Sequence, residues 1–313
     1  MITRVSQICT VKNEEATIDA LLTSFLSQTR PPDEIIIVDG GSVDSTREII
    51  GSYIREGAPF RLILSEGANI AQGRNIAIKS SSHEIIASTD AGCQLETTWL
   101  ERIIRPFEED PTIDVVSGAY RYIGTTPFEQ AAARIISLRM PMIDGVILPA
   151  SRSIAFKKSA WKKVHGYPEH LRFAEDTTFD YNLKMGGCKF GEAKDAVVVE
   201  KTRKNAQDLF TQYFNYSKWD MIAGNHNSQG RVAKATMYGS AMVILALVIG
   251  LNLPMGLLLL GGVVSYYVVR YGVLLSMGSK ASQDVLNGPL VVFTIMMGEF
   301  FGTVSGVITR KGA

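Results

Sequence analysis

The sequence predicts an α/β protein with a Rossmann-like, doubly wound and mostly parallel sheet, followed by C-terminal transmembrane helices. Short apolar runs alternate with helical segments through the first half of the chain, which is the pattern of strands joined by crossover helices. The run at residues 34–38 is β-branched without polar alternation, as expected of a strand buried on both faces of a parallel sheet. Long apolar blocks after residue 236 predict the membrane part.

The order of the elements follows from the same alternation. The predicted strands are residues 5–11, 34–38, 60–64, 84–89 and 114–122, and the predicted helices are residues 16–26, 47–55 and 99–107. Helix-capping residues at 42–46 precede the second helix. Asp39 and Asp90 come just past the carboxyl ends of two strands, which is where open α/β sheets bind ligands.

Composition excludes several kinds of protein. The 313 residues are 46% hydrophobic, which suffices for a substantial core, and a net charge of +1 without a dominant basic tract predicts no nucleic-acid partner. The three cysteines lack the spacing of a zinc site or a disulfide framework, so we expect reduced thiols in a cytosolic environment. The four histidines are scattered, and no phosphate-binding P-loop or dinucleotide fingerprint is present in the sequence.

The C-terminal part is predicted to lie in or on a membrane. Residues 237–275 are apolar apart from a break at Asn252-Leu-Pro254, and residues 285–308 form a second apolar block that carries one carboxylate, Glu299. A bilayer span needs roughly 20 apolar residues. The break leaves two alternatives open, a hairpin of two short helices or one kinked span, and the second block either crosses or dips back.

Charge patterning predicts the orientation of this membrane part. The basic residues that precede the first apolar block are Lys201, Arg203, Lys204, Lys218, Arg231 and Lys234. By the positive-inside rule they hold the N-terminal domain in the cytoplasm, and Arg310 and Lys311 favour an even number of crossings. No cleaved signal peptide is recognised at the N-terminus.

We therefore expect a multi-pass protein of the cell membrane with its first domain on the cytoplasmic side. Its predicted parts are a domain at residues 1–200, a juxtamembrane amphipathic segment at 201–235, and a membrane domain at 236–313 with two to three transmembrane segments.

Five motifs occur in order along the first two thirds of the chain. They are Thr10-Val-Lys-Asn-Glu-Glu, Val38-Asp-Gly-Gly-Ser-Val-Asp-Ser-Thr46, Gly73-Arg-Asn75, Ser88-Thr-Asp-Ala-Gly92 and Ala174-Glu-Asp-Thr-Thr-Phe179. Each motif alone is a weak signal, but the ordered set resembles the inverting family 2 glycosyltransferases, which have the GT-A fold. The resemblance implies transfer of a sugar from a nucleotide-sugar donor, UDP- or GDP-linked, to an acceptor.

The resemblance also implies a donor site at the strand ends. Asp39 would accept hydrogen bonds from the donor base or ribose, and Thr10 and Glu14 would border the same pocket. Arg74 would contact the diphosphate or the base, a task that suits a guanidinium because it stays charged and offers a planar fork of donors. The alternatives are an ordinary Asp-Gly-Gly-Ser turn for Asp39 and a helix-surface position for Arg74.

Asp90 resembles the first acid of the family's Asp-x-Asp motif, whose carboxylates contact the ribose and a divalent cation. Mg²⁺ or Mn²⁺ held there would neutralise charge on the departing diphosphate. The sequence departs from the motif at its third position, which is Gly92. One expected oxygen ligand is missing, and this puts metal dependence in doubt.

Glu175 and Asp176 resemble the family's catalytic Glu-Asp pair. The resemblance implies that Asp176 removes the proton of the acceptor hydroxyl as it attacks, which a carboxylate can do because the proton leaves late, when the oxygen has become acidic. The alternative is a helix N-terminus, where acidic residues interact favourably with the helix dipole, and both can hold at once.

Ser151-Arg-Ser-Ile-Ala-Phe156, followed by residues 161–167, resembles the acceptor side of the family. Trp161 and Tyr167 could stack on a sugar, although aromatic residues at this density pack in cores more often. Residues 127–149 show no regular pattern, so they either shape an acceptor pocket or connect two sheet regions. Gln212, Lys218 and Trp219 faintly resemble a motif of processive members, and an interfacial amphipathic helix explains them equally well.

The sequence thus predicts a membrane-bound hexosyltransferase of glycolipid or polysaccharide biosynthesis. The apolar tail suggests an acceptor held at the membrane, such as polyprenyl phosphate or a lipid-linked glycan, with membrane lipids as further partners. A non-catalytic subunit that binds nucleotide sugars or scaffolds a glycan-assembly complex is the alternative. The missing second metal acid favours that alternative, and the intact Glu175-Asp176 pair disfavours it. The oligomeric state is not predicted.

Overall fold

A computed structural model describes residues 3–137, 142–143, 146–147, 149–225, 227–251 and 281–311. The chain divides into two compact units. The sheet unit comprises residues 1–121 and 140–200, and the helical unit comprises residues 122–139 and 201–313.

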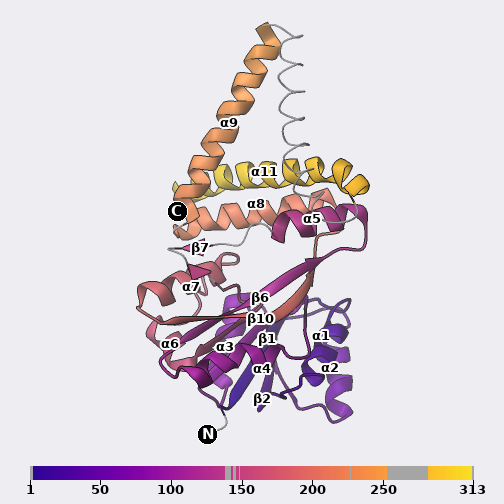
Figure 1. Ribbon diagram of the computed structural model, residues 1–313, viewed down its shortest axis with the longest axis vertical. Helices are drawn as coiled ribbons and strands as arrows, with labels where there is room; N and C mark the ends of the chain where they lie inside the picture. The colour runs from indigo at the N-terminus through magenta and orange to yellow at the C-terminus, as the bar shows by residue number, and fades with distance from the viewer. Residues whose placement is uncertain are drawn as a thin grey trace. The chain divides into compact units, whose positions relative to one another are not determined.

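The sheet unit is built around one mixed β-sheet (Figure 1). Its strands are β1 (Val5–Val11), β2 (Glu34–Asp39), β3 (Phe60–Leu64), β4 (Ile85–Asp90), β5 (Cys93–Leu95), β6 (Val115–Ile123), β9 (Ile154–Lys157) and β10 (Phe190–Lys201), in the order β3-β2-β1-β4-β9-β6-β10-β5. The pairs β1–β2, β1–β4 and β2–β3 are parallel. The pairs β4–β9, β9–β6 and β10–β5 are antiparallel. Strands β7 (Met142–Ile143) and β8 (Val146–Ile147) form a separate antiparallel pair.

Helices cover both faces of this sheet. One core cluster joins the sheet to α1 (Ile18–Leu26), α2 (Thr46–Arg55) and α4 (Trp99–Glu109). A second cluster joins the opposite face to α3 (Ile70–Ser80), α6 (Lys158–Lys163) and α7 (Glu175–Met185). Because successive strand residues face opposite sides, a strand without polar alternation supplies both clusters, as β2 does with Ile36 and Ile37.

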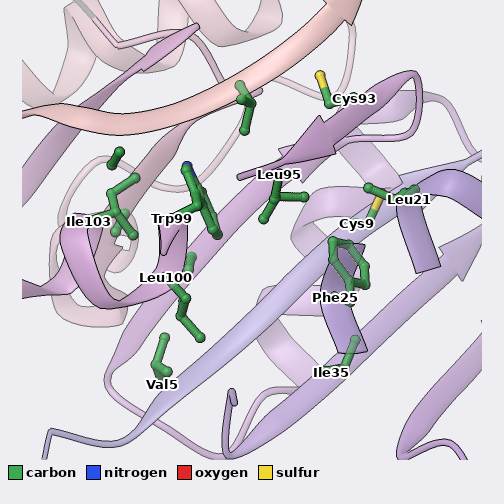
Figure 2. Close-up of a cluster of buried hydrophobic side chains, with 14 of the residues drawn as sticks. Val5, Cys9, Leu21, Phe25, Ile35, Cys93, Leu95, Trp99, Leu100 and Ile103 are labelled. Atoms are coloured by element: carbon green, nitrogen blue, oxygen red, sulfur yellow. The ribbon is translucent and has the colours of Figure 1, made fainter. Parts of the chain in front are cut away.

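The first cluster has Trp99 at its centre (Figure 2). The indole is fully buried between helix α4 and the sheet, and its Nε1 donates a hydrogen bond of 2.9 Å to Ser153 Oγ. Burying a ring of this size stabilises the fold by roughly 2–3 kcal/mol, and the hydrogen bond removes the cost of burying its polar atom. Cys9 and Cys93 lie in the same cluster as buried free thiols.

The helical unit consists of α5 (Pro127–Ser137), α8 (Ala206–Ala223), α9 (Asn227–Leu251) and α11 (Ala281–Lys311). Helix α11 packs along α8 through Gly298, Gly302 and Gly306, each of which lies against the α8 backbone. Glycines four residues apart share one helix face and let two backbones approach closely. Buried apolar residues of α5, α8 and α11 form the core of this unit.

A buried ion-pair network connects three of these helices. Arg231 of α9 donates from Nε to Asp220 of α8 and from Nη1 to Glu299 of α11, each at 2.9 Å. The lone carboxylate of the second apolar block, Glu299, is therefore paired with a cation. A charge this deeply buried requires such a partner.

One described helix is long and apolar enough to cross a membrane, judged by length and composition alone. It is the part of α11 at Asn287–Lys311, and half of its most apolar window is buried within the structure. Helix α9 covers the start of the first predicted apolar block, and the rest of that block, residues 252–275, lies outside the described residues. Among the described helices the structure thus offers one candidate span rather than several.

The predicted α/β sheet is confirmed, and two of its details differ from the prediction. Beyond β4 the pairs β4–β9 and β9–β6 are antiparallel, because β9 enters next to β4 from the later part of the chain. Residues 127–149, which show no regular pattern in the sequence, contain helix α5 and the β7–β8 pair. Helix α5 is short and alanine-rich, so its periodicity is weak, and its apolar side chains are buried against α8 and α11.

Substitution of Gly302 should destabilise the helical unit. A Cβ at this position would collide with the main chain of Phe214 on α8, which cannot move aside as a flexible side chain can. We expect Gly302→Val to lower the free energy of unfolding by about 2–3 kcal/mol, seen as a lower melting temperature. Gly230→Val is the matched control, because nothing lies within 4 Å of that Cβ position. Equal melting temperatures for the two variants would contradict the close packing of α8 and α11.

Candidate active site

The carboxyl ends of three adjacent parallel strands bring the predicted donor residues together. Strand β1 lies between β2 and β4, with Val11 paired to Asp39 and Thr10 paired to Asp90. Two strand spacings separate the two aspartates, which amounts to roughly 10 Å. Two acids at that spacing on one sheet edge can contact different parts of a single nucleotide.

Asp39 has one buried acceptor oxygen without a hydrogen-bond partner at this edge, among the described residues. Its side chain is fully buried, and Oδ1 accepts hydrogen bonds from the amides of Gly41 and Ser42, each at 2.9 Å, and from Arg47 Nε at 2.8 Å. Oδ2 is equally buried and has no hydrogen-bond partner among the described residues. A buried carboxylate oxygen without a donor is costly unless a ligand supplies one.

The surroundings of Asp39 keep it ionised. Burial alone would raise the pKa of this carboxyl, but the hydrogen bonds from Ser42, Arg47 and the Gly41 amide outweigh burial and hold the pKa below its ordinary value. At neutral pH the open Oδ2 is therefore an acceptor only, suited to an N–H or O–H group of a ligand.

The three residues of the Gly73-Arg74-Asn75 run have three different surroundings on helix α3. Gly73 lies against Thr10, so closely that a Cβ there would collide with the threonine side chain and push α3 away from β1. Asn75 holds the loop after α6, because its Oδ1 accepts from Trp161 Nε1 and from the Tyr167 amide, each at 2.9 Å. Between them, Arg74 points into the candidate site.

Arg74 connects the strand ends to helix α7. The guanidinium is 2% exposed, and it donates from Nη2 to Asp90 Oδ1 at 2.6 Å and from Nη1 to Glu175 Oε1 at 2.7 Å. It also lies over the ring of Tyr167, 5.2 Å from the ring centre. The helix-surface alternative for Arg74 is excluded by this burial, and its charge is placed between the two acidic motifs.

Helix α7 begins with the Glu175-Asp176 pair. Ala174, just before it, has a left-handed backbone with φ of 60°, which costs a non-glycine residue about 1 kcal/mol. Strain of this kind persists where the surrounding structure enforces it, often at functional sites. Its effect here is to turn the chain so that both acids occupy the first turn of the helix, where the helix dipole favours negative charge.

The two acids of this pair differ in burial. Glu175 is buried, and burial together with the neighbouring charge of Asp176 raises its pKa to about 7, against the opposing effect of Arg74. Asp176 is half-buried, and in the described part of the chain only Thr177 donates to it, through its amide at 2.7 Å and its hydroxyl at 3.4 Å. Asp176 is therefore the more accessible carboxylate of the pair.

Thr10 and Glu14 lie at the same edge as Asp39. Thr10 Oγ1 is buried and has no hydrogen-bond partner among the described atoms. Glu14 is half-buried, and its carboxylate accepts from Thr17 Oγ1 at 2.5 Å while its amide donates to Thr46 Oγ1. Glu14 thus fixes the loop after β1 to the start of α2, and its predicted contact with the donor stays a prediction.

The residues around Asp90 fit a cation only in part. Ala91 is buried, and Gly92 opens onto free space. Within the described ranges no group of three or more histidine, cysteine, aspartate or glutamate side chains could hold a metal ion. Magnesium commonly takes one or two carboxylates and completes its shell with substrate phosphates and water. Asp90 suits a cation of that kind, bound mainly by a diphosphate.

The predicted acceptor aromatics are packed in the core. Trp161 is largely buried with its Nε1 bonded to Asn75, and Tyr167 is stacked on Phe179 with ring centres 3.9 Å apart. The Tyr167 hydroxyl lies 3.0 Å from Ser151 Oγ. These contacts agree with the packing alternative, and contact with an acceptor stays a prediction.

The predicted juxtamembrane residues are on α8 in the helical unit. Gln212, Lys218 and Trp219 are all half-buried, and Gln212 Nε2 donates to the Tyr216 hydroxyl at 2.9 Å. Their place at the membrane interface stays a prediction.

The roles of two residues of the site were not predicted from the sequence: Arg47, which no motif singled out, and Asn75, which was quoted in a motif without a role. Arg47 bonds Asp39 and, from Nη2, Glu66 at 2.5 Å, and Asn75 fixes the loop after α6. The position of Arg47 on the first turn of the helix after Asp39 is a signal that could have suggested the first contact. The second contact joins residues about 90 positions apart and has no local signal.

The chain is similar in sequence to several known proteins. Glycosyltransferase AglE of Haloferax volcanii is 32% identical over 220 residues, which are 67% of this chain and 70% of that protein. The succinoglycan biosynthesis protein ExoA of Rhizobium meliloti is 26% identical over 66% of each protein. The poly-beta-1,6-N-acetyl-D-glucosamine synthase of Staphylococcus epidermidis is 29% identical over 58% of this chain, which spans 47% of that synthase.

A solved structure shows the same fold along nearly the whole chain. The mannosyltransferase PcManGT from Pyrobaculum calidifontis, in complex with GDP-Man and Mn²⁺, matches with a TM-score of 0.70 at 17% identity, covering 98% of this chain and 88% of that one. The family model described as glycosyl transferase family 2 matches residues 6–170, more than half of the chain. The chain therefore belongs to glycosyl transferase family 2, and it is a glycosyltransferase with a GT-A-like fold.

Proposed function

We propose that this glycosyltransferase moves a sugar, with inversion, from a nucleotide-sugar donor to a membrane-associated acceptor in glycolipid or polysaccharide biosynthesis. The observation that supports it best is the bridge of Arg74 between Asp90 and Glu175. Through this bridge the guanidinium of Arg74 connects Asp90 at the strand ends to Glu175 of α7. A donor diphosphate beside Arg74 would lie between a base-binding residue and a catalytic base.

Asp39 is proposed to read the donor base. Its open Oδ2 would accept a hydrogen bond from a ring N–H of the base, which both uracil and guanine possess. Thr10 Oγ1, which is also without a partner in the described structure, would complete this side of the pocket. The residues do not distinguish UDP-linked from GDP-linked donors.

Asp176 is proposed to act as the general base. The acceptor oxygen forms a bond to the anomeric carbon while the bond from that carbon to the diphosphate oxygen breaks, and the leaving diphosphate takes the electron pair. The acceptor proton passes to a carboxylate oxygen of Asp176. Attack on the face opposite the leaving group inverts the anomeric carbon. Glu175 holds Arg74 in place during this step.

A divalent cation is proposed to assist the departure of the diphosphate. Asp90 would be its protein ligand, and Mg²⁺ or Mn²⁺ would supply charge neutralisation on the leaving group. Arg74 supplies part of the same neutralisation from the protein itself. Mn²⁺ accompanies GDP-Man in the structure of PcManGT, and this supports a cation at the equivalent place here.

The helical unit is proposed to attach the enzyme to a membrane. Helix α11 contains the candidate span, and the exposed large apolar side chains along it are Leu290, Phe293, Phe301, Val304 and Ile308. Such a row requires an apolar partner. An acceptor such as polyprenyl phosphate or a lipid-linked glycan fits an enzyme held there, with the sheet unit on the cytoplasmic side and more than one crossing.

A transfer assay tests this function. The purified chain in detergent would receive a panel of labelled UDP- and GDP-sugars with a membrane lipid extract, with and without a chelator. We expect label in an organic-extractable product with inverted anomeric configuration, and loss of transfer with the chelator. Label that stays entirely in water-soluble glycan would contradict the lipid acceptor. Nucleotide binding without any transfer would favour the non-catalytic alternative.

Asp39→Asn should weaken donor binding. The variant replaces one carboxylate oxygen with an N–H₂ group. If this group takes the place of Oδ2, it is a donor that faces the ring N–H of the base; if it takes the place of Oδ1, it faces the three donors that Oδ1 binds. We expect the dissociation constant of the preferred nucleoside diphosphate to rise about 30-fold, measured by calorimetry. Glu66→Gln is the control, because Glu66 lies on the far side of Arg47. An unchanged affinity in Asp39→Asn would remove Asp39 from the donor site.

A further inference from the structure

Asp180 is a buried acid that the proposed reaction does not use. It lies on α7 one helical turn after Asp176, so the two carboxyls share a face of the helix. Its side chain is 1% exposed, and its Oδ1 has no hydrogen-bond partner among the described residues. An ionised carboxylate in such a place would be strongly unfavourable without a cation of its own.

In the described part of the chain, the cation that acts on Asp180 is Arg74, and its two bonds to acids go to other carboxyls. The groups that act on it are Asp176 and Glu175 from its own helix and Arg74 from α3, and Asp180 in turn acts on Tyr167 of the loop after α6. The two hydrogen bonds that Arg74 makes to acids go to Asp90 and Glu175. The guanidinium of Arg74 therefore interacts with four carboxyls, those of Asp90, Glu175, Asp176 and Asp180. Glu175 and Asp180 are the buried ones, and Asp180 accepts no hydrogen bond from Arg74.

We propose that Asp180 is a positioning residue that stays protonated and uncharged, so that Arg74 remains bonded to Asp90 and Glu175 and available to a donor diphosphate. An ionised Asp180 would compete for the guanidinium and add negative charge beside the place where an anionic diphosphate binds. The uncharged form prevents both effects.

The direction of the pKa shift of Asp180 agrees with this geometry. Burial, reinforced by the charges of Asp176 and Glu175, raises the pKa of Asp180 well above its ordinary value, against the opposing effect of Arg74. A carboxyl whose pKa is higher in the folded state than in the unfolded state stabilises the fold fully only below its unfolded pKa of about 3.9. That contribution is lost as the pH rises through the folded pKa.

The inference rests on the proposed function for its consequence, but protonation itself can be observed independently. Infrared difference spectra between the wild type and Asp180→Asn at pH 7 would show the carbonyl stretch of a protonated carboxyl that disappears in the variant. Glu109→Gln, an exposed site on α4, is the control and should not remove such a band. A difference spectrum with only the carboxylate bands of an ionised acid would overturn the proposal.

The consequence is tested with UDP and GDP as probes. The wild type should bind the preferred nucleotide at pH 7 and lose affinity at least tenfold at alkaline pH, as Asp180 ionises. Asp180→Asn, which keeps the shape of the neutral acid, should bind within about threefold of the wild type at pH 7 and lose clearly less affinity at alkaline pH. Superimposable pH profiles for the two proteins would overturn the proposal.

Failure of the proposed function and failure of the proposed role of Asp180 give different results. If neither nucleotide binds the wild type at any pH, the proposed function fails, and the infrared band still decides whether Asp180 is protonated. If Asp180→Asn loses more than 100-fold affinity at pH 7 while its melting temperature is unchanged, the charged form of Asp180 is required. That result would overturn the proposal alone.

Discussion

Asp176→Asn is expected to lower the turnover number on the order of a thousandfold. The amide has nearly the shape of the carboxylate but cannot take a proton from the acceptor hydroxyl, and general base catalysis of this kind contributes roughly a hundred- to ten-thousandfold. Donor affinity should change little, because Asp176 accepts hydrogen bonds only from Thr177 among the described residues. Steady-state transfer and nucleotide calorimetry on the same preparation measure the two effects.

The control for this variant is Asp195→Asn. Asp195 is a half-buried acid on β10 that pairs with Arg105 at 2.9 Å. Its amide should leave turnover unchanged, so a loss specific to Asp176 reports the chemistry. Retained turnover in Asp176→Asn would exclude this residue as the general base, and Glu175 would then be the candidate base.

Arg74→Met is expected to damage both stability and donor binding. Methionine fills similar space but leaves Glu175 buried without its cation, and breaking a buried pair costs roughly 3–5 kcal/mol. The loss should fall near 3 kcal/mol, because Glu175 already has a pKa of about 7 and can take up a proton instead. Affinity for the nucleoside diphosphate should fall about 100-fold, since the charge facing the phosphates is gone.

The pH dependence of this loss identifies its cause. The ion pair between Arg74 and Glu175 contributes only while Glu175 is ionised, and the pKa of Glu175 is about 7. The difference in unfolding free energy between wild type and variant should therefore shrink as the pH falls through about 7. Arg61→Met is the control, because Arg61 is exposed and 3.8 Å from Glu34. If Arg74→Met changed the unfolding free energy no more than Arg61→Met does, at any pH, the bridging role of Arg74 would be contradicted.

The strand-end part of the site could be predicted from sequence because its signals are local. A β-branched run followed by Asp39 and a glycine turn describes a buried strand and the residue just past its end. The same reasoning applies to Asp90 after β4. Parallel strands from one sheet then bring both residues to one edge without any knowledge of side-chain contacts, and the structure agrees.

The rest of the site depends on contacts between distant residues. The bond from Arg74 to Glu175 joins positions 101 residues apart, and nothing near either residue indicates its partner. Asp180 looks like an ordinary polar residue of an exposed helix until its burial is known. The role of Tyr167 is also ambiguous in the sequence, because an aromatic residue near a site can either face a sugar or pack in the core. The fold shows that Tyr167 packs on Phe179.

The sheet shows the same division. Its parallel half follows from the strand and helix alternation of the first 90 residues. The insertion of β9 between β4 and β6 could not be predicted, because an apolar run of four residues does not encode which neighbour it pairs with or in which direction.

A structure of the chain with its preferred nucleoside diphosphate would test the central claim most directly. We expect a ring N–H of the base within hydrogen-bond distance of Asp39 Oδ2 and the diphosphate beside Arg74 and Asp90. Asp176 should face the terminal phosphate, where the sugar would be attached. A nucleotide bound elsewhere, or one that leaves Asp39 Oδ2 without a donor, would contradict the assignment of this sheet edge as the donor site.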